Sequence, residues 1–174
     1  AFILIAAGVI ETVAIILYLF ALSQEETSVV VPIFQTVPVF SFVFGYFILG
    51  ETLTTTQMIA GLVVIIGSII LTLEFSGENR SAKLKTRMLF IMLLSSFMIA
   101  LFDALFKLGA LAHPFWSAVF WQHIGILSTG LAIFVFNYRY RAAFIHRLRD
   151  SGTRVLSLNA VNEFLNVVGV ILMT

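Results

Sequence analysis

The stretch FILIAAGVIETVAIILYLFAL, residues 2–22, contains one acidic or basic side chain, Glu11, in an otherwise mostly apolar run. An α-helix needs about 20 mostly apolar residues to cross the hydrocarbon core of a bilayer, so this stretch predicts a membrane-spanning helix. Five more runs of this kind follow, at 28–49, 56–75, 88–111, 115–137 and 155–174. They are continuously apolar, whereas the strands of a membrane barrel would alternate apolar and polar residues. The sequence therefore predicts an all-α, polytopic transmembrane helix bundle.

The composition agrees with a lipid environment. Hydrophobic residues make up 60% of the 174 positions and charged residues 11%, whereas a soluble domain has roughly 25% charged residues. The chain has no Cys, which excludes disulfides and cysteine-ligated metal, and its net charge of +1 gives no indication of nucleic-acid binding. We therefore expect no metal, no cofactor and no nucleic-acid partner. Both ends of the sequence lie in apolar runs, and we expect the chain to be an internal fragment of a longer protein.

The basic residues are concentrated in two of the connections between the runs. Nine of the ten Lys and Arg residues lie in 76–87 and 138–154. Six antiparallel helices would place these two connections on one side of the membrane, and 50–55 and 112–114 on the other. The positive-inside rule then predicts that 76–87 and 138–154 are cytoplasmic, in a multi-pass protein that we expect in the plasma membrane. Recognition of anionic lipid is a second role open to these basic residues.

The stretch Ser28–Leu71 combines several features that are weak when taken singly. It has prolines within a helix, a glycine, an acidic residue after the helix, a Thr-rich turn and a second helix with glycines, at Pro32, Pro38, Gly45, Glu51, Gln57, Gly61 and Gly67. In this combination it resembles the hallmark of the EamA-type drug/metabolite transporter superfamily. The resemblance implies ten helices in two inverted five-helix repeats, of which this chain would contain about six.

The resemblance also implies a division of the chain. Residues 1–75 would be the last three helices of the first EamA-like repeat, 76–87 a basic loop, and 88–174 the first three helices of the second repeat. A shift of 152 residues pairs Glu11 with Glu163, an acidic residue within another apolar run. The two runs are five helices apart and therefore run in opposite directions, as inverted repeats require.

Ionisable side chains within the apolar runs are the first candidates for function, because a charge at the bilayer centre costs roughly 2.5–3.5 kcal/mol on insertion scales. There are four: Glu11, Asp103, Lys107 and Glu163. Glu11 is interpreted either as a neutral, buried acid bonded to a neighbour or as a proton-coupling site. Asp103 and Lys107, at i and i+4, would form a structural ion pair, or Lys107 would attract an anionic substrate group.

The last run has a polar face. Its residues Asn159, Asn162, Glu163 and Asn166 follow i, i+3, i+4, i+7 spacing. A lipid-facing stripe of this kind would be costly, so we expect these side chains to line a substrate or proton pathway, the alternative being a hydrogen-bonded seam between helices. The resemblance favours the pathway, because the corresponding helix of these transporters lines the central cavity.

Three further polar residues have weaker assignments. Gln35, between the two prolines, is a candidate for the cavity wall, the alternative being a local backbone partner. We expect Glu51 to cap the helix that follows it, through 54–56, or to accept a hydrogen bond from the neighbouring loop. We interpret His123 as a packing residue with a satisfied ring.

These features together predict a secondary transporter that moves a small organic metabolite or drug by alternating access, with proton coupling left open. The sequence has no HExxH, GxSxG or Walker-type motif, and we predict that it is not an enzyme. The alternative is a non-transporting membrane scaffold or accessory subunit. The expected partners are the solute, the lipid bilayer and protons, and the oligomeric state is not predicted.

Overall fold

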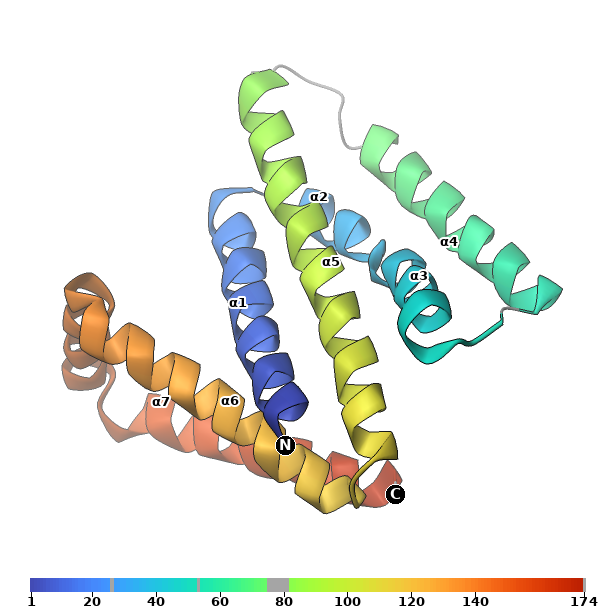
Figure 1. Ribbon diagram of the computed structural model, residues 1–174. Coiled ribbons are helices and arrows are strands. Elements are labelled where there is room, and N and C mark those ends of the chain that lie inside the picture. Colours follow the sequence, from blue (N-terminus) through green and yellow to red (C-terminus); the bar gives the residue numbers. More distant parts are fainter. Residues whose placement is uncertain (26, 53, 75–81, 174) are drawn as a thin grey trace. The chain divides into compact units, whose positions relative to one another are not determined.

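A computed structural model describes residues 1–25, 27–52, 54–74 and 82–173, and these ranges contain helices and no strand (Figure 1). The helices are α1 (Phe2–Gln24), α2 (Thr27–Phe34), α3 (Val37–Leu49), α4 (Thr55–Glu74), α5 (Ala82–Leu111), α6 (Phe115–Phe136) and α7 (Tyr138–Met173). The predicted all-α class is therefore confirmed.

In the part of the chain that the structure describes, four segments are long and apolar enough to cross a membrane. They are Phe2–Gln24, Val30–Leu49, Arg87–Leu111 and Phe115–Phe136. They coincide with four of the six predicted runs, and the shorter apolar helix Thr55–Gly67 lies in a fifth. The protein is thus a polytopic membrane protein, as predicted.

The chain forms two compact units, Ala1–Thr129 and Gly130–Thr174. The first contains α1 to α5 and most of α6, and the second contains the end of α6 and all of α7. Each unit is described by itself below. The assignment of 1–75 and 88–174 to two inverted repeats stays a prediction.

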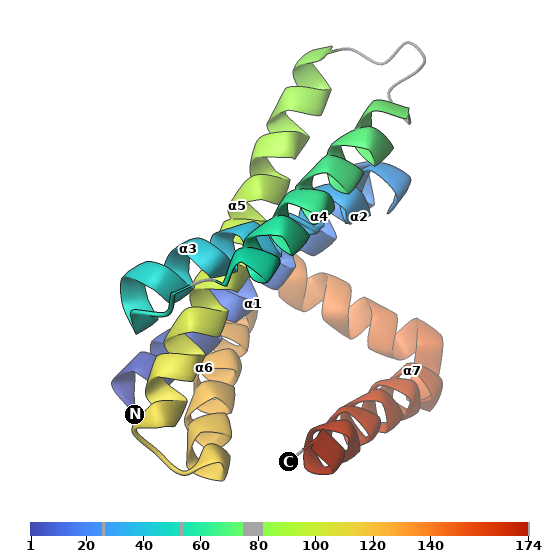
Figure 2. The same ribbon diagram turned by 90° about the vertical axis from the view of Figure 1, so that its right-hand side faces the viewer.

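Within the first unit, α1 and α5 lie side by side and run in opposite directions (Figures 1 and 2). Small side chains allow this close packing, because they let two helix backbones approach in a membrane. The alanine side chains buried on the two helices are Ala7, Ala14, Ala21, Ala100 and Ala104. The Ser95 hydroxyl donates a buried hydrogen bond of 2.8 Å to the Ala14 carbonyl, which fixes α5 against α1.

The predicted helix 28–49 is two helices, α2 and α3, joined by a turn at Gln35 and Thr36. Pro38 causes the interruption, because it has no N–H to donate to the carbonyl four residues earlier and its ring crowds that position. The Thr36 hydroxyl and amide both donate to the Ile33 carbonyl, at 2.8 and 3.0 Å, and hold the turn. The turn separates α2 from α3, and α3 packs on α5 beyond it.

The start of α4 is fixed by a capping box. The Thr54 amide donates to Gln57 Oε1 at 2.9 Å, and the Gln57 amide lies 3.4 Å from Thr54 Oγ1. This reciprocal pairing satisfies two backbone donors at the helix end. The prediction that Glu51 caps this helix is therefore wrong: Thr54 occupies the cap, and Glu51 follows Gly50, which ends α3 with a φ of 66°.

Two predicted basic loops are wholly or partly helical. The helix α5 begins at Ala82, so the second half of 76–87 is helix, while 76–81 lie outside the described residues. The helix α7 begins at Tyr138, so the prediction of a loop at 138–154 is wrong. Charge ends a membrane crossing but does not end a helix, and Arg, Ala and Leu are all good helix formers. Figure 2 shows that α7 bends part-way along its length.

Candidate intramembrane polar site

Glu11 lies near the middle of α1, on the side that meets α6. The side-chain amide of Gln122 donates a hydrogen bond of 2.8 Å to Glu11 Oε2. Gln122 is buried, with 9% of its surface exposed, and Glu11 is partly buried. The bond links residues 111 positions apart in the sequence and gives an acid in the middle of a membrane span a polar partner.

Two glycines bring α1 and α6 close enough for this bond. A Cβ on Gly8 would lie 2.1 Å from the Gln122 carbonyl oxygen, and a Cβ on Gly125 would lie 2.2 Å from the Ile5 carbonyl oxygen. Neither position has room for a side chain, so the backbones touch where these glycines meet. Glu11 is three residues after Gly8, and Gln122 is three residues before Gly125. One helical turn therefore separates the backbone contact from the acid–amide pair.

The helix α5 adds a second acid. Asp103 lies on α5, the helix that packs against α1, and its side chain is exposed. Two turns earlier on α5, the Ser96 hydroxyl is buried and has no hydrogen-bond partner among the described residues. The helices α1, α5 and α6 thus contribute Glu11, Asp103 and Gln122, a set that we call the acid–amide cluster.

Lys107 does not complete this cluster. Its ammonium forms an ion pair with the Glu51 carboxylate, and both side chains are about half exposed. The predicted ion pair between Asp103 and Lys107 is therefore wrong, because within the described residues Lys107 pairs with Glu51. An i,i+4 pair stabilises a helix by only about 0.2–0.5 kcal/mol. The end of α3, packed on α5, brings a competing carboxylate within reach of the flexible lysine stem.

The first part of the chain is similar to a known protein family. Residues 1–73 match the model of the EamA-like transporter family. We refer to residues 1–73 as the EamA-like segment, after the family that they are similar to. The match confirms the predicted resemblance and supports a general role in transport, since the family is one of transporters rather than enzymes. No curated protein and no solved structure matches the chain.

The EamA-like segment contributes only part of the polar site. Glu11 and Glu51 lie within it, whereas Asp103, Lys107 and Gln122 lie in the remainder of the chain. Both interactions described above, Glu11 with Gln122 and Glu51 with Lys107, therefore join the EamA-like segment to residues beyond it.

The other predicted site residues are Gln35, in the first unit, and four residues of α7, in the second. Gln35 is exposed in the turn between α2 and α3, where its backbone amide, rather than its side chain, donates to the carbonyls of Val31 and Pro32. The side chains of Asn159, Glu163 and Asn166 lie outside the described residues, and Asn162 is exposed on α7. A pathway along this face of α7 stays a prediction.

Sequence reasoning missed Gln122 as the partner of Glu11. An amide within an apolar run, three residues from a glycine, was the available signal. The adjacent His123 is exposed, so its predicted packing role is not seen, although its Nδ1 lies 2.8 Å from the Val119 carbonyl oxygen one turn earlier.

Proposed function

We propose that the protein is a secondary transporter, or part of one, that moves a small organic solute by alternating access, with Glu11 as its central acid. The observation that carries this proposal is the hydrogen bond from Gln122 to Glu11 at the glycine contact between α1 and α6. Packing of two helices does not require an acidic side chain beside the contact, and such a side chain is costly within a membrane span. An ionisable residue inside a membrane span is a candidate functional site for this reason.

The chemistry of the acid–amide cluster favours cations. Two carboxyl groups on adjacent membrane helices, Glu11 and Asp103, can each bind a proton or a cation. The pair therefore attracts a proton or a cationic group of a solute, such as an amine. If both compete for the same carboxyl groups, binding of the solute releases a proton, and this exchange couples the two fluxes. The Gln122 amide can orient Glu11 throughout, because an amide donates to a carboxyl oxygen in either protonation state.

Alternating access requires contacts that can break at one end of the protein. The ion pair between Glu51 and Lys107 joins the EamA-like segment to α5 at the end where α3 and α5 finish. In the proposed cycle this pair closes that end and separates when the two halves rock apart. An exposed ion pair suits such a contact, because it contributes only about 0–1 kcal/mol and opens at little cost.

The test is solute-driven proton movement in proteoliposomes that contain the full-length protein and a pH-sensitive dye. Amino acids, nucleosides and polyamines are the solutes to add first. For a solute that changes the internal pH with the wild type, Glu11→Gln should abolish the change and weaken binding of the cationic solute, because both need the Glu11 carboxyl. The matched control is Glu25→Gln, the same substitution at the C-cap of α1. Equal proton movement by Glu11→Gln and wild type would refute the assignment.

A further inference from the structure

The first part of α7, residues 138–150, has the sequence YRYRAAFIHRLRD and is helical. It contains four arginines and one acidic residue, Asp150. That many charges cannot cross a hydrocarbon core at acceptable cost. A helix with this composition must lie outside the core, in water or at the membrane surface.

Its apolar side chains favour the membrane surface over water. Tyr138, Tyr140, Phe144 and Ile145 are all exposed, from 42% for Ile145 to 72% for Tyr138. Aromatic residues of this kind are enriched at membrane–water interfaces, where the ring meets the acyl chains and the polar groups stay hydrated. A helix that combines arginines with such residues is typical of a segment lying in the interface plane.

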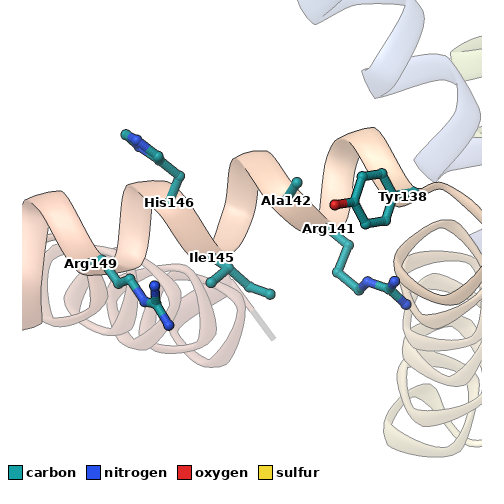
Figure 3. Close-up of a pocket in the computed structure, with 6 residues that line it drawn as sticks. All are labelled: Tyr138, Arg141, Ala142, Ile145, His146 and Arg149. Atoms are coloured by element: carbon teal, nitrogen blue, oxygen red, sulfur yellow. The ribbon is translucent and has the colours of Figure 1, made fainter.

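One face of this segment forms a groove of about 270 Å³. Its lining residues are Tyr138, Arg141, Ala142, Ile145, His146 and Arg149 (Figure 3). Figure 3 shows Arg141 and Arg149 directed to the same side of the helix as Ile145, which lies between them. The groove therefore has an apolar floor and a guanidinium group toward each end.

The charges around the groove suit an anion. The Arg141 guanidinium lies 5.5 Å from the centre of the Tyr138 ring, a cation–π contact that orients it. The carboxylate oxygen Oδ2 of Asp150 lies 2.7 Å from His146 Nδ1. Figure 3 shows that His146 points away from the side of the helix that Arg141 and Arg149 share. Among the residues that the structure describes, neither of these arginines is paired with an acidic side chain.

We propose that residues 138–150 of α7 lie along the membrane surface and that the groove binds the phosphate of an anionic phospholipid. Guanidinium groups bind phosphate oxygens in a bidentate geometry, and Ile145 and Ala142 would meet the glycerol and upper acyl region of the same lipid. A lipid fits better than a free anion, because the exposed rings beside the groove need an apolar partner that a soluble phosphate cannot supply. This proposal does not depend on the solute or on proton coupling.

The test uses the absence of Cys from residues 1–174, and any Cys elsewhere in the full-length protein is first replaced by Ser. A single Ala143→Cys substitution in the full-length protein, next to the groove, takes an environment-sensitive fluorophore, and the labelled protein is reconstituted in vesicles. Quenching by brominated phosphatidylglycerol is compared with quenching by brominated phosphatidylcholine at the same mole fraction. We expect a several-fold preference for the anionic lipid, since one basic residue near an anionic surface changes binding about fivefold.

The matched variants separate the groove from general charge. Arg141→Gln combined with Arg149→Gln should reduce the preference nearly to parity. The control combines Arg139→Gln with Arg147→Gln, which removes the same amount of charge from residues outside the groove lining. This control variant should retain most of the preference for the anionic lipid. Circular dichroism of each variant checks that α7 is intact.

Four results would overturn the proposal. The first is equal quenching by the two lipids with the wild type, and the second is an equal loss in the two double variants. The third is a fluorophore that aqueous iodide quenches fully and that no brominated lipid reaches, which would place the segment in water. Displacement of the anionic lipid by millimolar inorganic phosphate would identify a soluble anion as the ligand instead, and would also count against a lipid site.

Discussion

Replacing Gly8 with Ala is the sharpest structural test of the acid–amide pair. The new Cβ would lie 2.1 Å from the Gln122 carbonyl oxygen, 1.3 Å short of the 3.4 Å at which ordinary contact begins. The obstructing atom belongs to the backbone, so α1 and α6 must separate rather than a side chain rotate. A separation of that size would stretch the bond between Gln122 and Glu11, now 2.8 Å, past the range of a hydrogen bond.

We expect Gly8→Ala to lower the free energy of unfolding by about 1–3 kcal/mol, the usual cost of overpacking. Gly125→Ala should cost a similar amount, because its Cβ would lie 2.2 Å from the Ile5 carbonyl oxygen. The double variant should cost less than the sum of the two, since one separation of the helices relieves both clashes. Unfolding by SDS titration in mixed micelles provides the measurement.

The matched control is Gly130→Ala, also on α6, where a Cβ would meet nothing within 4 Å. It should leave stability unchanged or raise it by up to about 1 kcal/mol, because Ala is the better helix former. If Gly8→Ala and Gly125→Ala behave like Gly130→Ala, the close contact of α1 with α6 does not exist, and the reasoning that joins Glu11 to Gln122 fails with it.

Three other substitutions test separate parts of the structure. Exchanging the charges of Glu51 and Lys107 should restore most of what either single reversal loses, with a coupling of about 0.2–1 kcal/mol in a double-mutant cycle of unfolding. A coupling of zero would contradict the proposal that this pair closes its end of the protein. Thr54→Ala should cost about 1 kcal/mol of stability through loss of the α4 cap, whereas an unchanged SDS midpoint would contradict the capping box. Asn162→Ala and Glu163→Gln should each slow solute uptake by the full-length protein in proteoliposomes, and normal uptake by both would exclude the polar face of α7 from the pathway.

The membrane character and most spans follow from the sequence alone, because long apolar runs leave few alternatives. Glu11 was found in the same way, as an acid in a hydrophobic run. Its partner was not, since Gln122 is brought to it by a glycine contact between helices 111 residues apart. Periodicity within one helix indicates which face is polar, but it does not identify the helix that this face meets.

The errors have separate physical causes, and one of them is that local patterns do not report competition from distant groups. Asp103 and Lys107 have the spacing of an ion pair, yet Lys107 forms its ion pair with the Glu51 carboxylate. The arginines of 138–154 predict a loop, yet the segment is helical, because nothing in 138–150 breaks a helix. The prediction for Asn159, Glu163 and Asn166 stands untested, since their side chains lie outside the described residues.

The most direct test of the transport proposal is whether the Glu11 carboxyl exchanges its proton with water from within the membrane. Infrared difference spectroscopy of the reconstituted protein can isolate the carbonyl band that disappears in Glu11→Gln. We expect this band to shift promptly when H₂O is replaced by D₂O and to change on addition of a transported solute. A Glu11 band that neither exchanges nor responds would mean that Gln122 holds the acid in a dry seam between helices, which would contradict a coupling role.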